Sequence, residues 1–304
     1  MIVTTPQEFV AAYSPARFPA TAPATPRAAF LVAPHGFALA AESAQDNRYM
    51  AMSERTDASS ALAEHAELAA QLRTCLPTIV FPGDAQMPDA VFPNNVFAGA
   101  PGRLIVGAMR HEVRRREAQR ADVRAFFAQM LQCEIVDLSA RPCVAELTGA
   151  LVIDHARGIG YCGLSERCDM AGARAMHEAF RLKLTFCFAL APGEYHTNVV
   201  LAVLASRAVL IAADGFADAA DAAAIASVYA PLVLQLDAAQ KAAFAGNAIT
   251  LSPDAVWMSA RAAASLHVDQ RAALADWGFA LRSVELAEIE KAGGSLRCCV
   301  AEIF

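Results

Sequence analysis

Short apolar runs alternate along this chain with longer segments in which apolar residues recur at helical spacing. A typical round has a hairpin of two short strands over 150–154 and 158–164, a helix over 170–182, and a strand over 185–190. Similar rounds recur at intervals of roughly sixty residues, although no sequence repeat is legible. A doubly wound sheet needs simple alternation of strands and helices, and the hairpins argue against it. The pattern therefore predicts an α/β fold built of pseudo-symmetric modules around an axis.

The same patterning predicts the remaining elements. Further helices are expected over 61–75, 111–131, 218–229 and 262–277. Further strands are expected over 29–33, 78–81, 90–97, 103–108, 135–138, 198–204, 208–213, 232–236, 248–251, 255–259, 281–286 and 298–304.

The chain is expected to form one large domain preceded by a tail. Residues 1–27 are rich in Pro, Thr and Ala, and we expect a loose tail whose degree of order the sequence leaves open. Residues 28–304 are expected to form a single domain, since a chain of this length can bury a large core.

Composition and charge argue against several classes of protein. The longest apolar stretch, 198–213, is interrupted by Ser206 and Arg207 and is too broken for a membrane span. The formal net charge of −6 argues against nucleic acid as the main partner. The N-terminus lacks the basic and apolar regions of a signal peptide. We therefore expect a cytoplasmic protein that binds neither nucleic acid nor membrane.

The eight cysteines contain no CxxC pair and fall at no metal-ligand spacing, so no metal site is predicted. Most are expected to be reduced and buried. Cys298 differs because it follows the pair Gly293 and Gly294, which lets the backbone approach a ligand closely. This position suits a nucleophile if a histidine and carboxylates come from elsewhere in the fold. A half-buried structural cysteine after a turn is the alternative interpretation.

Four further segments place polar side chains at the edges of predicted strands. Asp89 precedes an apolar run, Glu146 and His196 each stand before a strand, and Arg167 follows one. Each also has an ordinary interpretation, as a turn-capping aspartate, a loop acid, a core histidine or a surface arginine. With Cys298 they provide a thiol, a histidine, two carboxylates and an arginine, a set suited to covalent catalysis.

Several segments resemble the amidine-modifying enzymes of the pentein superfamily, which includes arginine deiminases, dimethylarginine hydrolases and arginine amidinotransferases. The chain is most similar to the amidinotransferase-like bacterial branch described as citrulline-utilisation hydrolases. The matching segments span nearly the whole chain after the tail and are DAVFPNN (89–95), RRRE (114–117), LSERCD (164–169), YHTNV (195–199), FAGN (244–247) and GGSLRCCVAEIF (293–304).

The resemblance implies a five-bladed α/β propeller with a Cys-His-Glu site in its single catalytic domain. It implies Cys298 as the nucleophile, His196 as the general acid and base, and Glu146 as the partner carboxylate of His196. It implies that catalysis needs no metal and no organic cofactor. Many relatives are dimers, which leaves a homodimer open.

The resemblance also implies how a small guanidino or ureido substrate is bound. Asp89 is expected to hold the nitrogens of the substrate, and Arg167 its α-carboxylate. Arg116 is a weaker candidate for the same carboxylate.

The implied activity is hydrolysis of a carbon–nitrogen bond in an arginine- or citrulline-type substrate. Asn198 stands where arginine deiminases have a second aspartate, and an amide carries no charge. We therefore expect a substrate less cationic than arginine, such as a ureido compound. Two alternatives stay open: an amidinotransferase that uses the same intermediate, and a catalytically inactive propeller that serves as a binding module. Leu147 and Ala292 replace glycines that are common in relatives, which also leaves a loss of activity open.

Overall fold

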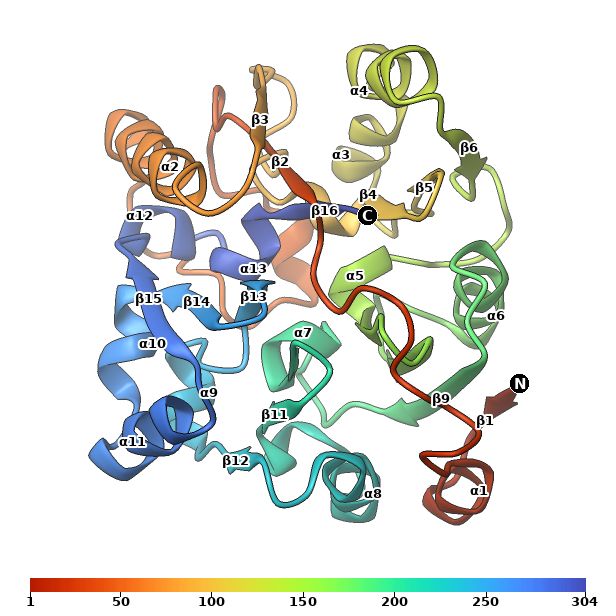
Figure 1. The fold of residues 1–304 in the computed structure, drawn as a ribbon. Helices are drawn as coiled ribbons and strands as arrows, with labels where there is room; N and C mark the ends of the chain where they lie inside the picture. The colour runs from red at the N-terminus through yellow and green to blue at the C-terminus, as the bar shows by residue number, and fades with distance from the viewer.

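A computed structural model describes all 304 residues. Its strands form five separate sheets that lie around a common centre (Figure 1). In each sheet the first strand pairs antiparallel with a second, and the second pairs parallel with a third. The mixed α/β class predicted from the sequence is confirmed.

The strands of the five sheets follow one another around the centre. They are β4 (Phe97–Ala100), β5 (Arg103–Val106) and β6 (Glu134–Asp137); β7 (Leu151–Asp154), β8 (Ile159–Leu164) and β9 (Leu184–Ala189); β10 (Leu201–Leu204), β11 (Ala208–Ile211) and β12 (Val233–Gln235); β13 (Ile249–Ser252), β14 (Ala255–Ser259) and β15 (Ala280–Val284); and β16 (Ala301–Ile303), β2 (Ala28–Val32) and β3 (Thr78–Phe81).

Helices connect these strands. They are α2 (Ala58–Leu72), α3 (Glu112–Arg115), α4 (Ala121–Ala125), α5 (Leu147–Ala150), α6 (Met170–Ala179), α7 (Thr197–Val200), α8 (Ala219–Tyr229), α9 (Ala238–Ala242), α10 (Ala260–Ser265), α11 (Val268–Asp276), α12 (Ala287–Glu290) and α13 (Leu296–Cys299).

A single helical turn precedes the first strand of several sheets. These turns are α5 before β7, α7 before β10, α13 before β16, and the 3₁₀ turn Pro93–Asn95 before β4. The strands predicted to begin at residues 198 and 298 therefore begin later, at Leu201 and Ala301. The strand predicted over 90–97 is wrong, because this segment forms turns and β4 begins only at Phe97. A short apolar run fits a buried helical turn as well as a strand, so the pattern could not separate the two.

Two predicted helices are broken in the structure. The helix expected over 111–131 is interrupted at Arg120, whose φ of −57° and ψ of 99° lie outside the helical region. The helix expected over 262–277 divides into α10 and α11, because Leu266 and His267 are extended. Apolar periodicity continued across both breaks and concealed them.

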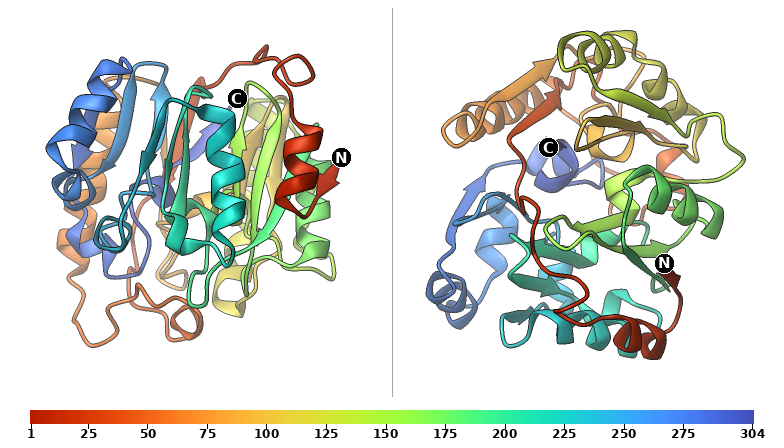
Figure 2. Two further views of the ribbon diagram at one scale, coloured as in Figure 1. Left: turned by 90° about the horizontal axis from the view of Figure 1, so that it is seen from below. Right: turned by 45° about the vertical axis from the view of Figure 1, so that its right-hand side comes forward.

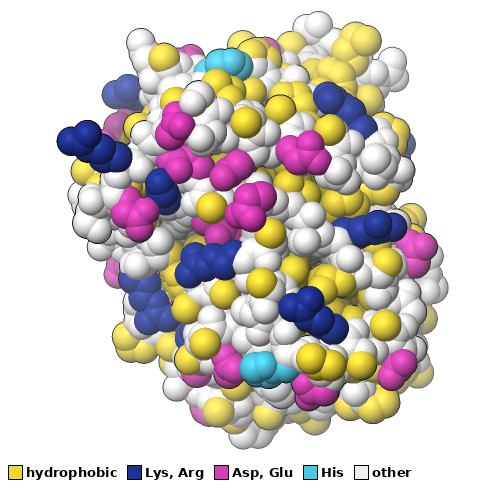
Figure 3. Space-filling model, turned by 90° about the vertical axis from the view of Figure 1, so that its left-hand side faces the viewer, with side chains coloured by type: hydrophobic (Ala, Val, Ile, Leu, Met, Phe, Trp, Pro, Cys, Tyr) yellow, Lys and Arg dark blue, Asp and Glu magenta, His cyan; other side chains and the backbone are white.

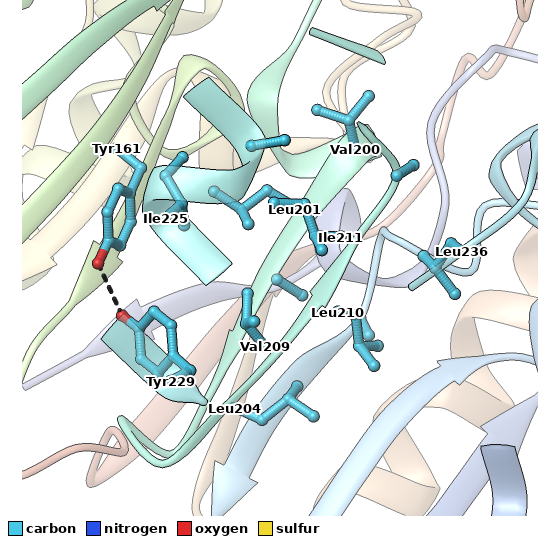
Figure 4. Packing of buried hydrophobic residues seen from close by; sticks show 14 of the residues in the cluster. Tyr161, Val200, Leu201, Leu204, Val209, Leu210, Ile211, Ile225, Tyr229 and Leu236 are labelled. Carbon is cyan, nitrogen blue, oxygen red and sulfur yellow. Dashed lines mark hydrogen bonds between the residues drawn. The ribbon is translucent and has the colours of Figure 1, made fainter. Parts of the chain in front are cut away.

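The largest group of buried apolar side chains contains 39 residues and packs around β10, β11 and α8. Figure 4 shows part of it, with Val200, Leu201 and Ile211 close together. Tyr161 and Tyr229 are hydrogen-bonded within it at an oxygen–oxygen distance of 3.0 Å (Figure 4). The polar ends of these two rings are thus satisfied inside an otherwise apolar core.

The N-terminal segment, expected as a loose tail, contributes two elements to the core. Strand β1 (Ile2–Val3) pairs parallel with β9, and helix α1 (Pro6–Ala12) begins at Thr5, whose hydroxyl caps it. Phe9 on α1 is fully buried and stacks on Phe186 at a ring-centroid distance of 4.8 Å. After α1 the chain crosses one end of the molecule, opposite the loop that follows β2 (Figure 2).

The face formed by α2, α11 and α12 carries charged side chains of both signs among apolar ones (Figure 3). The exposed surface of the molecule includes few large apolar side chains, among them Val268 on α11. No helix of the structure combines the length and the apolar character needed to cross a membrane.

Phe9→Ala should lower the free energy of unfolding by about 3–5 kcal/mol, because it removes a fully buried ring from a packed core. Urea unfolding followed by circular dichroism measures this difference. Val10→Ala, on the exposed face of the same helix, is the control and should change stability by no more than about 0.5 kcal/mol. Equal effects of the two substitutions would mean that α1 does not pack on the core.

Candidate active site

The polar residues near the centre occupy equivalent places in different sheets. Glu146 and His196 stand at the N-cap positions of α5 and α7. Four further residues each stand three positions before the first strand of their sheet, and they are Asn94, Thr148, Asn198 and Cys298. The one-turn helices thereby direct side chains from different sheets toward one point.

Glu146 links two of the predicted site residues. His196 Nε2 lies 2.9 Å from Glu146 Oε2, and Arg167 Nη1 donates to the same carboxylate at 3.1 and 3.3 Å. The side chains of Glu146 and His196 are fully buried, and that of Arg167 is 2% exposed. This is a buried, hydrogen-bonded chain of an imidazole, a carboxylate and a guanidinium.

The environment gives each group of the chain a definite charge at neutral pH. Burial opposes ionisation of Glu146, but Arg167 and the hydrogen bond to His196 outweigh burial and hold its pKa well below the ordinary range. Burial lowers the pKa of His196, and Glu146 counteracts this only in part. His196 is therefore neutral at rest, with Nε2–H donated to Glu146 and Nδ1 left without a partner.

The thiol of Cys298 is almost completely buried at the centre. Asn247 Nδ2 donates to its sulfur at 3.3 Å, and the Asn198 amide lies 3.9–4.0 Å from the same atom. Burial raises the pKa of this thiol, although both amides and the backbone at Ser295 favour the thiolate. The resting pair is thus a neutral thiol and a neutral imidazole.

Cys298, His196 and Asp89 line one small pocket together with Arg114 and Arg167. Its volume is about 20 Å³, which is room for roughly one water molecule. The loop 33–57 between β2 and α2, here called the covering loop, closes it with Ser43 and Asn47. This volume is far below the roughly 300–1,000 Å³ that small-molecule sites occupy.

The covering loop is attached to the site by several polar contacts. Ser43 Oγ donates to Asp89 Oδ2 at 2.6 Å, and the carbonyl of Ser43 accepts from Arg167 Nη2 at 2.8 Å. Asp46 accepts from Arg167 Nε at 2.6 Å. Arg167 therefore joins the loop directly to Glu146. Farther along the loop, Tyr49 donates to the buried carboxylate of Glu194 at 2.7 Å.

Asp89 is 2% exposed and pairs with the Ser43 hydroxyl, without a direct ion pair. Burial raises its pKa, while Arg114 and Arg167 lower it in part. Arg114 is itself held by both oxygens of Glu117 at 2.8 Å and donates to the carbonyl of Phe92.

Several buried polar atoms at the centre have no partner in the protein. They are the side-chain oxygen and nitrogen of Asn94, the oxygen Oδ1 of Asn95, and the ring nitrogen Nδ1 of His196. Asn95 and His196 approach the same glycine, because a Cβ on Gly149 would lie 2.6 Å from Asn95 Oδ1 and 2.8 Å from His196 Nδ1. Buried groups without partners are rare and commonly meet a ligand or water.

No group of three or more His, Cys, Asp or Glu side chains is arranged to hold a metal ion.

A family model described as "N,N dimethylarginine dimethylhydrolase, eukaryotic" matches residues 33–304. The chain belongs to this family. Membership confirms the predicted resemblance to the pentein superfamily, while the narrower assignment to the citrulline-utilisation branch stays a prediction. No curated protein sequence matches the chain at a significant level.

Three solved structures share the fold of this family member. The N-terminal domain of ArgZ, an arginine dihydrolase from cyanobacteria, is 17% identical with a TM-score of 0.78, over 91% of this chain and 97% of that one. AgrE is 17% identical with a TM-score of 0.79, over 91% of this chain and 39% of that one. A dimethylarginine dimethylaminohydrolase is 19% identical with a TM-score of 0.69, over 91% and 100% of the two chains.

Not every predicted site residue lies where the sequence placed it. Arg116 is exposed on the surface, because on the single turn of α3 it is Arg114 that points inward. Arg167 is buried, and all three of its guanidinium nitrogens have protein partners, so it lies beneath the covering loop and not at an open rim. Asn198 lies 3.9 Å from the thiol but does not line the pocket of Cys298, and it lines a separate small cavity instead.

Three contributors to the site were not identified from the sequence as site residues. They are Arg114, Asn247 and the covering loop with Ser43 and Asp46. The recurrence of a polar residue just before the first strand of each hairpin was a usable signal for Asn247. No local pattern marked the loop, because its contacts are with residues distant in the sequence.

Glu146→Gln should lower the free energy of unfolding at pH 7 by about 3 kcal/mol, at the lower end of the cost of breaking a buried ion pair, because Arg167 keeps Asp46. The folded-state pKa of Glu146 is depressed from 4.5, so its contribution is present above that pH and is lost as the pH falls. Urea unfolding should therefore show the same difference between the two proteins at pH 7 and 5.5, and a smaller difference at pH 4. Glu166→Gln at an exposed ion pair is the control, and a difference for Glu146→Gln that is constant with pH would contradict the assignment.

Alkylation of Cys298 by iodoacetamide should rise with pH and reach half its maximal rate above 9.0, the ordinary thiol value, because burial raises the pKa of this thiol. Asn247→Ala should move the profile to still higher pH, since it removes the closest donor to sulfur. Asn198→Ala should move it less, because its amide is farther away. Mass spectrometry in a Cys299→Ala background measures the rate. A profile centred below 9.0 would contradict the raised pKa of this thiol, and one centred below 7 would show that the resting thiol is ionised.

Proposed function

We propose that this chain is a cysteine-dependent hydrolase that cleaves a carbon–nitrogen bond of a small guanidino or ureido compound resembling an amino acid. The observation that carries the proposal is the convergence of Cys298, His196 and Asp89 on one buried pocket, with Glu146 hydrogen-bonded to His196 at 2.9 Å. A thiol, a base with its orienting carboxylate, and a second carboxylate form the set needed for covalent catalysis at an amidine or urea carbon.

Asp89 receives the nitrogens of the substrate in this proposal. It is the carboxylate of the pocket that lacks a direct ion pair, and a planar, nitrogen-rich group would satisfy it. The unpartnered Oδ1 of Asn95, which lines the same pocket, offers a further hydrogen bond. Fixing the reacting carbon against sulfur in this way can supply roughly 7–11 kcal/mol of a barrier.

The resting protonation states suggest the order of steps. The neutral His196 takes the proton of Cys298 at Nδ1, the nitrogen that has no partner. The sulfur then bonds to the substrate carbon, and the departing nitrogen takes that proton as its bond to carbon breaks. Water, deprotonated by the again neutral His196, displaces the sulfur and restores the thiol. Glu146 holds the ring and stabilises its cationic form.

A positive charge on the substrate would assist the first step. A nearby cation favours the thiolate of Cys298 and the ionised form of Asp89, both of which burial disfavours in the empty pocket. A neutral ureido substrate, expected from Asn198, would give less of this assistance. The two substrate classes therefore differ in how strongly their turnover depends on pH.

The proposal includes a five-bladed propeller as the scaffold. Five sheets with one strand order and one pairing pattern support it, as do the equivalent positions of the central residues in their sheets. The relatives support the chemistry, since the ArgZ domain is described as an arginine dihydrolase and was solved as a Cys-to-Ser mutant bound to substrate. The dimethylarginine dimethylaminohydrolase is described as an adduct with a chloropyridine.

The test is release of ammonia or methylamines from arginine, citrulline, their Nω-methylated forms and their N-succinylated forms. We expect turnover of one of these classes, and a loss of at least about 10³-fold in kcat for Cys298→Ala, because the covalent route is removed. Cys299→Ala is the matched control, since this neighbouring thiol is buried outside the pocket. Turnover that survives Cys298→Ala would overturn the proposal.

A second readout covers a substrate outside this panel. Chloroacetamidine should alkylate Cys298 faster than chloroacetamide does, because its cationic group suits Asp89. Asp89→Asn should abolish that preference. An inert thiol together with no turnover would favour a binding module without catalysis.

A further inference from the structure

A second hollow lies at the end of the molecule away from the covering loop. It is a half-open cavity of about 550 Å³, within the range of roughly 300–1,000 Å³ that small-molecule sites occupy. Its walls are the segment 22–27, the turn from β4 to β5, and residues 180–183 after α6. Segment 22–27 belongs to the stretch that crosses this end (Figure 2). None of the residues of the proposed active site lines it.

The rim of this cavity is cationic although the chain is acidic overall. Arg27, Arg103, Arg181 and Lys183 line it, and no aspartate or glutamate does. Glu134 outside the lining pairs with Arg103 at 3.0 Å and reaches Arg181 at 4.0 Å. The side chains of Arg27 and Lys183 form no hydrogen bond or ion pair and are exposed. Two of the four cations on the rim, Arg27 and Lys183, thus have no carboxylate partner in the protein.

Aromatic and aliphatic side chains form the floor of the cavity. The rings of His155 and Phe304 stack at a centroid distance of 3.9 Å and an angle of 26°. Burial lowers the pKa of His155 to about 3, so this ring is neutral at physiological pH. Ile153, Phe180 and Leu182 extend the apolar surface. A planar group can lie against this floor while its charge meets the rim.

Arg181 is held on the rim in an unfavourable backbone conformation. It follows the C-cap Phe180 of α6 with a φ of 52°, a place where glycine or asparagine is usual. A bulky side chain there costs on the order of 1 kcal/mol, and such strain concentrates at binding sites. The strained backbone of Arg181 and the unpaired side chains of Arg27 and Lys183 together indicate that this rim binds a ligand.

We propose that this cavity binds an organic anion in which a flat apolar group carries a carboxylate, sulfonate or phosphate. The flat group lies on the His155–Phe304 stack, and the anion is held by Arg27 and Lys183, with Arg181 beside them. The site is separate from the active site and does not depend on the proposed hydrolase activity.

Isothermal titration with naphthalene-1-sulfonate tests the proposal. We expect saturable binding of one probe per chain that weakens as salt is raised. Sodium sulfate and 1-naphthalenemethanol, which carry only the charge or only the ring, should each bind at least about tenfold more weakly. Because each lost contact to an anion is charge-assisted, Arg27→Gln/Lys183→Gln should weaken probe binding at least about tenfold.

Two further variants make the outcome specific. Arg55→Gln/Arg282→Gln removes two exposed cations without side-chain partners elsewhere and should leave the affinity unchanged. Phe304→Ala should weaken binding severalfold through the floor alone, with thermal unfolding confirming that each variant is folded. The proposal is overturned by non-saturable binding, by equal losses in the two double variants, or by full affinity in Arg27→Gln/Lys183→Gln. Self-association that is released by this double variant in sedimentation would assign the cavity to a second copy of the chain and would also overturn it.

Discussion

The buried pairing of Arg167 with Glu146 is the interaction on which the centre of this molecule depends. Its two members lie on different elements, and Arg167 also holds Ser43 and Asp46 of the covering loop. Glu146 can stay ionised without contact with water because Arg167 is beside it, and only an ionised Glu146 fixes the tautomer of His196. One guanidinium thus connects the charge state of the site with the position of its cover.

The repeated architecture explains how these groups converge. Each sheet begins near the centre, and in four of the five a single helical turn before the first strand brings one or two side chains inward. Glu146 and His196 occupy the same place in neighbouring sheets. Asn198 and Cys298 share a place two residues nearer the first strand, in the sheets that begin with β10 and β16. In such a repeated scaffold the backbone places equivalent positions at the centre, and the residue type at each position determines its chemical role.

Much of this arrangement was predictable, and the failures have physical causes. The hairpin of β7 with β8 and the strand β3 follow from apolar patterning and agree closely with the prediction. The turns α7 and α13 do not, because a four-residue apolar stretch is compatible with either conformation once it is buried. Motifs indicated Cys298, His196 and Asp89, which the structure brings to one pocket. The motif did not reveal that Arg114, and not Arg116, points inward, because tertiary packing sets the inward face of a single helical turn.

The neutral state of the Cys298 thiol affects how readily this residue is oxidised. Oxidants and electrophiles in the cell react with thiolates much faster than with thiols. Burial raises the pKa of Cys298, and the covering loop leaves little space beside it, so an unoccupied molecule presents a poor target to peroxide. A sulfur buried in this way resists oxidative damage for as long as the pocket keeps this closed form.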